Sequence, residues 1–117
     1  MRHHHKGRSL SRPKNQRQAL LRSLARSLVI HERISTTEAK ARELRPFMEK
    51  LVTRAKADTV ANRRLITARI QDADATKKLF VAIGPRYKER AGGYTRIVKR
   101  AKRGLNDARK LAYIAFV

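Results

Sequence analysis

Apolar residues follow helical spacing soon after the start of the chain. Leu21, Leu24, Ala25 and Leu28 occupy the i, i+3, i+4 and i+7 positions of one helical face. The residues between them are mostly arginine, serine and other polar types. This pattern predicts a helix over residues 14–31.

A second apolar stripe is clearer and predicts the next helix. It consists of Ala41, Leu44, Met48, Leu51, Val52 and Ala55. Pro46 lies inside this stripe and predicts a kink or a boundary, because proline removes one helical hydrogen bond. The β-branched residues 33–37 predict a short strand or extended link before it. The capping signal of this second helix is Ser35-Thr36-Thr37-Glu38, in which a hydroxyl lies three residues before a carboxylate.

The second half of the chain changes from helical to strand patterns. Shorter helices are predicted over about 59–70 and from an Asp74 cap to about residue 83, where Gly84-Pro85 ends the second one. Residues 94–99 and 110–117 have the composition of strands, with a turn near 103–107 between them. These two strands predict a C-terminal β-hairpin.

The predicted fold class is therefore α+β. We expect a helix, a short strand, three helices and a C-terminal β-hairpin in two layers, as one domain over residues 13–117. Residues 1–12 have no apolar periodicity and form a basic N-terminal arm in this interpretation. Such a segment buries too little apolar surface to order itself, so we expect it to order against a partner.

Charge decides which partner to expect. The 117 residues include 30 Lys+Arg and 9 Asp+Glu, which gives a net charge of +21. A polyanion would relieve the self-repulsion of such a chain, and nucleic acid is the natural candidate. Aromatic residues make up only 5%, which favours phosphate contacts over an aromatic stacking platform. No apolar run is long enough for a membrane span or a secretion signal, and we expect a cytoplasmic protein.

The candidate RNA-binding residues fall in four groups along the chain. The arm contributes Arg2, His3, His4, His5, Lys6, Arg8 and Arg12, and the first helix contributes Lys14, Arg17, Arg22 and Arg26. The third helix adds Arg63 and Arg64. The C-terminal region adds Arg86, Tyr87, Lys88, Arg90, Tyr94, Arg96, Lys99, Arg100, Lys102 and Arg103. Tyr87 and Tyr94 could stack on bases or cover the edge of the core.

Several other chemistries find little support. The run His3-His4-His5 could be the remnant of a purification tag, but cations continue on both sides of it. Three adjacent imidazoles on an extended arm converge poorly on one metal ion, and no cysteine is available. We find no nucleophile motif and no phosphate-cradling glycine loop, so no metal, cofactor or enzymatic activity is predicted.

Short motifs along the whole chain resemble the bacterial large-subunit ribosomal protein seventeen family. They are Met1-Arg2-His3, Gly7-Arg8, Ala19-Leu20-Leu21-Arg22, Ile34-x-Thr36-Thr37, Ala39-Lys40-Ala41-x-Glu43-Leu44, Glu49-Lys50-Leu51, Arg63-Arg64-Leu65, Lys78-Leu79-Phe80, Pro85-Arg86-Tyr87 and Gly92-Gly93-Tyr94-Thr95-Arg96-Ile97. Their order and spacing carry the resemblance. The chain departs from the family pattern in the histidine run, in the turn at 103–107 and at Ala115.

The resemblance implies an α+β structural protein of the large ribosomal subunit. It implies binding to large-subunit ribosomal RNA near the polypeptide exit side, with ribosomal protein thirty-two as a neighbour. A nucleoid-like DNA-binding protein is the alternative, with residues 63–80 as a helix pair in the groove of the duplex. A basic enzyme acting on RNA, with His31 as its reactive group, is a third and weaker reading.

Overall fold

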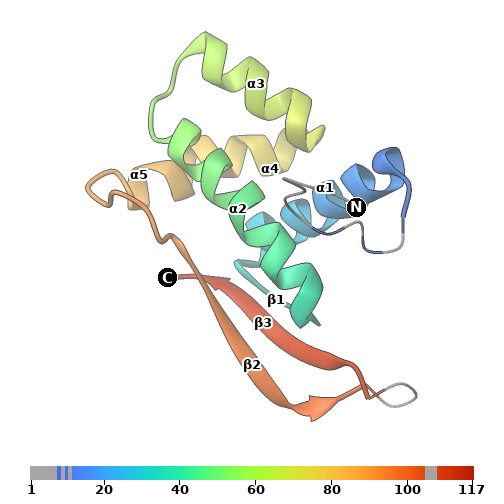
Figure 1. Cartoon of the computed structure of the whole chain (residues 1–117). Coiled ribbons are helices and arrows are strands. Elements are labelled where there is room, and N and C mark those ends of the chain that lie inside the picture. The colour runs from blue at the N-terminus through green and yellow to red at the C-terminus, as the bar shows by residue number, and fades with distance from the viewer. Residues whose placement is uncertain (1–7, 9, 11, 105–107) are drawn as a thin grey trace, which may run out of the picture.

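Two layers make up the fold, one of helices and one of β-strands (Figure 1). The computed structural model describes residues 8, 10, 12–104 and 108–117. Its elements are α1 (Lys14–His31), β1 (Arg33–Thr37), α2 (Glu38–Ala55), α3 (Val60–Ile70), α4 (Ala73–Lys78), the π-helix η1 (Leu79–Ile83), α5 (Gly84–Arg86), β2 (Thr95–Arg103) and β3 (Lys110–Phe116). The predicted α+β class and the C-terminal hairpin are confirmed.

The sheet has three antiparallel strands in the order β1-β3-β2, so the last strand in sequence is the central one. Ile114 of β3 pairs with Ile34 of β1 on one side and with Ile97 of β2 on the other. Ile114 is fully buried beneath the helices, as is Ala112. Because strand residues alternate between faces, one face of the sheet packs on the helical layer and the other points outward.

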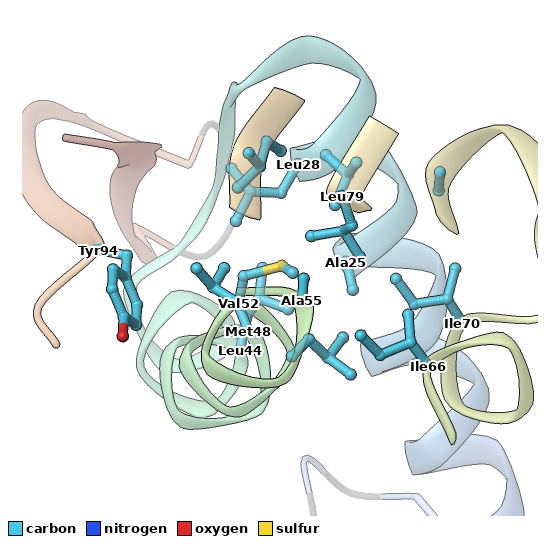
Figure 2. Packing of buried hydrophobic residues seen from close by; sticks show 14 of the residues in the cluster. Ala25, Leu28, Leu44, Met48, Val52, Ala55, Ile66, Ile70, Leu79 and Tyr94 are labelled. Atoms are coloured by element: carbon cyan, nitrogen blue, oxygen red, sulfur yellow. The ribbon is translucent and has the colours of Figure 1, made fainter. Parts of the chain in front are cut away.

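Helix α2 lies at the centre of the molecule, between the sheet and the other helices (Figure 1). Its stripe of Leu44, Met48 and Val52 meets Leu28 of α1 and Leu79 of η1 in one continuous core (Figure 2). The apolar stripes predicted for α1 and α2 are buried, apart from the half-buried Leu24. Burial of these side chains is the main driving force that holds the two layers together.

Two details at α2 differ from the prediction. The helix is capped by Thr37 rather than Ser35, because the Thr37 hydroxyl accepts a hydrogen bond from the Lys40 N–H at 3.3 Å. The strand β1 continues to Thr37, so its last residue is also the cap of α2. Pro46 lies inside one continuous helix and forms no boundary.

The fourth predicted helix also differs in its bounds. It begins at Ala73 with Asp72 as the cap, since the Asp72 carboxylate accepts from the Asp74 N–H at 3.1 Å. The helix does not end at Gly84-Pro85, because the π-helix η1 leads into α5, which continues to Arg86. Pro85 lies in the first turn of α5, where the fixed φ of proline is compatible with a helix.

Candidate nucleic-acid interface

Ion pairs neutralise only a small part of the positive charge. Within the described residues, the ion-paired cations are Arg17, Arg42, Arg63, Lys78, Arg86 and Lys99. Their acidic partners are Glu43, Glu38, Asp58 and Glu32. Most of the remaining lysines and arginines in the described part of the chain are therefore available to an external anion.

The first helix uses its arginines largely within the protein. Arg22 Nε donates to the carbonyl oxygen of Arg69 at 3.1 Å. Arg26 donates to the carbonyl oxygens of Ile70 at 2.8 Å and of Gln71 at 3.0 Å. These carbonyls lie at the C-terminal end of α3, where a helix leaves its last acceptors without internal donors. The two arginines thus fasten α1 to α3.

Arg17 also has internal partners, whereas Lys14 is exposed at the start of the same helix. The Arg17 guanidinium contacts the Glu43 carboxylate of α2 at 2.9 Å and donates to the backbone carbonyl of Arg8. Arg12 is exposed and donates to the carbonyl of Leu10 at 2.8 Å. The other predicted arm residues, Arg2, His3, His4, His5 and Lys6, lie outside the described residues.

Both arginines of α3 are exposed, but only Arg63 is ion-paired within the protein. Arg63 forms a two-point contact with Asp58 at 2.5 and 2.8 Å, and its guanidinium lies 4.8 Å from the centre of the Phe80 ring. The hydrogen bond from Arg63 lowers the pKa of the Asp58 carboxyl, and Asp58 in turn raises the pKa of Arg63. Arg64 is exposed and contacts no partner within the described residues.

Both candidate stacking tyrosines are buried. Tyr87 is 4% exposed and Tyr94 is 1% exposed, with ring centres 5.3 Å apart. The Tyr87 hydroxyl donates to the Val117 carbonyl at 2.5 Å. The Tyr94 hydroxyl lies 3.2 Å from the Thr53 hydroxyl and 3.0 Å from Lys56 Nζ, and these hydrogen bonds lower its pKa. The structure therefore favours the core alternative for both rings, and we exclude them from the interface.

A carboxylate on α2 places the start of the basic hairpin. Glu49 accepts hydrogen bonds from the backbone N–H groups of Tyr94 and Thr95 at 3.0 and 3.3 Å, and from the Thr95 hydroxyl at 3.2 Å. β2 therefore leaves the helical layer at a fixed point. Beyond it, β2 passes along α2 as far as Lys99, and the far part of the hairpin extends past the helices (Figure 1).

The hairpin carries the densest group of exposed cations in the described chain. Its predicted site residues are Arg96, Lys99, Arg100, Lys102 and Arg103, and Lys110 adds a further charge on β3. Lys99 approaches the Glu38 carboxylate at 3.8 Å, and Arg100 donates to the Ser35 hydroxyl at 2.8 Å. Arg96, Lys102 and Arg103 are exposed without a partner among the described residues. We call Arg96, Lys99, Arg100, Lys102, Arg103 and Lys110 the hairpin cations.

The loop before the hairpin is less uniform than its composition suggests. Arg86 is ion-paired with Glu32 at 2.5 Å, and this contact raises the pKa of Arg86. Arg90 donates to the Gly92 carbonyl at 3.2 Å, while Lys88 is exposed with no partner in the described part. Only part of this loop is thus open to an external phosphate.

The outer sheet face holds two residues, Arg33 and Tyr113, that the sequence analysis missed. Arg33 of β1 and Arg100 of β2 lie over the Tyr113 ring of β3, with guanidinium carbons 3.9 and 4.8 Å from the ring centre. Alternation along residues 110–117 could have indicated that Tyr113 points away from the buried Ala112 and Ile114. The pairing of β1 with β3, which brings Arg33 there, leaves no local signal in the sequence.

Other kinds of site are not evident in the part of the chain that the structure describes. That part contains no group of three or more histidine, cysteine or carboxylate side chains placed to hold a metal ion. None of the described helices combines the length and the apolar character that a membrane crossing needs.

The fold and the surface together define a small, strongly basic α+β protein whose exposed cations exceed its own carboxylates. The family model for ribosomal protein L17 matches residues 20–117, which is most of the chain. The chain belongs to the ribosomal protein L17 family, and the resemblance noted in the sequence is confirmed. Membership makes it a component of the large ribosomal subunit, in a class of proteins whose role is structural rather than enzymatic.

Proposed function

We propose that the protein binds large-subunit ribosomal RNA and neutralises its phosphates, so that RNA helices can pack close together. The observation that carries this proposal is the set of hairpin cations, which far outnumber the carboxylates near them. Self-repulsion of these groups is relieved when phosphates replace the missing negative charge. The family membership supports ribosomal RNA as the source of those phosphates.

The shape of the hairpin supports insertion between RNA segments. Its far part extends past the helical layer, and its base is anchored through Glu49 (Figure 1). A projecting arm with cations along its length can reach phosphates that a compact surface cannot. Recognition by backbone charge and shape follows, since A-form RNA exposes few base edges to side chains.

Arg8, Arg12, Lys14, Arg64 and Lys88 are the remaining exposed cations that we place in the interface. The arm residues Arg2, His3, His4, His5 and Lys6 belong to the same proposal. Arg17, Arg22, Arg26, Arg63 and Arg86 are secondary, because each already has a partner within the protein. This division follows from the contacts that each guanidinium makes.

The location of the protein in the subunit and its neighbours are proposed from the family resemblance. We place the protein near the polypeptide exit side of the large subunit, in the cytoplasm, beside ribosomal protein thirty-two. We propose no catalytic activity. The nucleoid-like alternative needs both arginines of α3 in a DNA groove, but Arg63 is held by Asp58 and Phe80.

Salt-dependent binding tests the proposal. We would measure binding of the full chain to folded large-subunit rRNA and to duplex DNA of matched length at several salt concentrations. Each lost phosphate contact lowers the slope of log K against log salt by about 0.9 for a duplex. Replacing Lys102 and Arg103 by alanine should therefore lower the slope by about 1.8.

The matched control replaces Arg54 and Lys77, which are exposed on the helices and lie outside the proposed interface. Its slope should stay close to that of the wild type. Equal loss in both double variants would reject the hairpin as the binding surface. Equal or tighter binding to duplex DNA would favour the nucleoid-like alternative.

A further inference from the structure

The outer face of the β-sheet is not covered by any described helix. On β3, Ala112 and Ile114 point into the core, whereas Tyr113 and Ala115 lie on the opposite face and are only half-buried. Val98, which pairs with Tyr113 across the ladder, is 49% exposed. An apolar strip therefore remains open on a protein whose surface is otherwise dominated by charge.

Two arginines hold the aromatic ring of this face. Arg33 pairs with Ala115, two residue pairs to one side of Tyr113, while Arg100 lies two residues beyond Val98 in the other direction. They therefore reach the ring from opposite ends of the ladder, at 3.9 and 4.8 Å from its centre. Stacking on the ring orients each guanidinium, and an ordered guanidinium loses less entropy when it binds a phosphate.

Next to this stack lies a shallow depression of about 500 Å³. Its lining combines Val98, Tyr113, Ala115 and Val117 with the charged side chains of Arg33 and Arg96. This volume lies within the range of small-ligand sites, about 300 to 1,000 Å³. The lining offers flat apolar contact beside two positive charges.

Charge indicates what fills the depression. Arg33, Arg96 and Arg100 make no ion pair within the described residues, and no acidic residue lines the depression. Arg100 also borders a second hollow, which Arg103 and Lys110 line together with Glu38 of α2, so Arg100 lies between the depression and the hairpin cations. A ligand that combines a planar apolar ring with a negative charge, and that also follows the basic hairpin, fits a nucleotide of RNA.

We infer that the outer sheet face binds an unpaired nucleotide of large-subunit rRNA. The base lies against Val98 and Tyr113, and its phosphates contact Arg33 and Arg96. Bases in RNA loops and bulges are free to leave their stack and to pack on aromatic rings and guanidinium planes. This inference rests on the proposed function, to which it adds one specific recognition site.

The test probes the bases of the rRNA directly. Full-length protein is bound to large-subunit rRNA, and unpaired adenines and cytosines are methylated with dimethyl sulfate. We expect the wild type to protect a small set of unpaired bases. Tyr113→Leu should lose that protection, while Arg54→Ala, which removes an exposed cation from the helical layer, should retain it.

Binding to single-stranded oligouridylate measures how much each side chain contributes to the affinity for RNA. Loss of one stacked base costs about ten-fold in affinity, so Tyr113→Leu should bind about ten-fold more weakly with an unchanged salt slope. Arg96→Ala should lower the slope by about 0.7, the value for one phosphate of a single strand. Tyr113 is half-buried on the outer face, and a thermal melt will verify that both variants fold.

The outcomes separate this inference from the proposed function. If the wild type does not bind rRNA, the proposed function fails. If it binds and both variants keep the wild-type protection and affinity, only the nucleotide site is rejected. If the variants keep their RNA contacts but lose a cross-link to another large-subunit protein, the face belongs to a protein partner and the inference is wrong.

Discussion

Glu32 and Arg86, far apart in the sequence, form an ion pair with Nη1 and Oε1 separated by 2.5 Å. Glu32 ends α1 with a positive φ of 64°, and a carboxylate at this end of a helix is unfavourable by itself. Lys78 contacts the same carboxylate at 3.2 Å. The two cations therefore allow an acidic residue at a position where the helix dipole disfavours it.

This arrangement predicts a pH-dependent loss of stability in acid. The hydrogen bond from Arg86 is the main cause that lowers the pKa of Glu32 from 4.5 to about 2. Because the pKa is lower in the folded state, the stabilisation is complete above about pH 4.5 and disappears as the pH falls to about 2. Glu32 is partly exposed, so we expect only about 1 kcal/mol.

Glu32→Gln should therefore lower the free energy of unfolding by about 1 kcal/mol at pH 7 and hardly at all near pH 2. Denaturant unfolding at a series of pH values and low salt measures this difference. Glu89→Gln is the control, because Glu89 is exposed and unpaired within the described residues. A difference that does not change with pH would show that charge is not the cause.

Gly84 and Gly93 allow the cost of a steric clash to be measured apart from the cost of backbone strain. A Cβ at this position would lie 2.4 Å from the Ala55 carbonyl oxygen, and a backbone atom cannot easily move away. Gly84→Ala should thus lower the free energy of unfolding by about 2 to 3 kcal/mol. Gly93→Ala is the comparison, since Gly93 has a φ of +63° but open space around it.

For Gly93→Ala we expect a loss of about 1 kcal/mol, which is the cost of a left-handed conformation alone. Chemical denaturation of the two variants under one condition gives both values. Similar losses would mean that the backbone at the contact between Gly84 of α5 and Ala55 at the end of α2 can shift to make room for the methyl group.

Local patterns were enough to predict most of the elements. The bounds of α1 and β1 follow from the spacing of apolar residues and from a run of β-branched ones. The π-helix η1 has no such signal, because it differs from an α-helix only in its hydrogen bonding, and the predicted end at Gly84-Pro85 was wrong.

Long-range pairing could not be predicted in the same way. The central position of β3 depends on contacts with two strands that are distant in sequence. For the same reason, the carbonyl contacts of Arg26 with α3 and the stacking of Arg33 on Tyr113 were missed. Composition identified a cationic surface, but only the fold separates arginines that hold the protein together from those that face outward.

Glu49 connects the helical layer to the start of the hairpin through hydrogen bonds. Its carboxylate accepts two backbone N–H groups and one hydroxyl at the start of β2. Glu49→Ala would leave part-buried donors unsatisfied, which costs about 2 kcal/mol. We expect hydrogen exchange at Tyr94 and Thr95 to increase more than exchange in α1. Uniform changes throughout the protein would instead indicate general destabilisation.

Arg26 and Arg64 offer the sharpest separation between stability and RNA binding. Arg26→Ala removes two hydrogen bonds to the end of α3 and should lower the free energy of unfolding by about 1 to 2 kcal/mol. Arg64→Ala removes an exposed guanidinium and should change stability by less than about 0.5 kcal/mol. The two changes remove the same charge, so net charge cannot explain a difference between them.

Binding to large-subunit rRNA should show the opposite order. Arg64→Ala should lower the salt slope by about 0.9, as one lost phosphate contact does, while Arg26→Ala should change it less. Thermal melts and binding titrations on the same preparations provide both quantities. If Arg26→Ala instead lowered the slope by a full contact and left stability unchanged, its carbonyl contacts would be dispensable, and α1 would belong to the RNA surface after all.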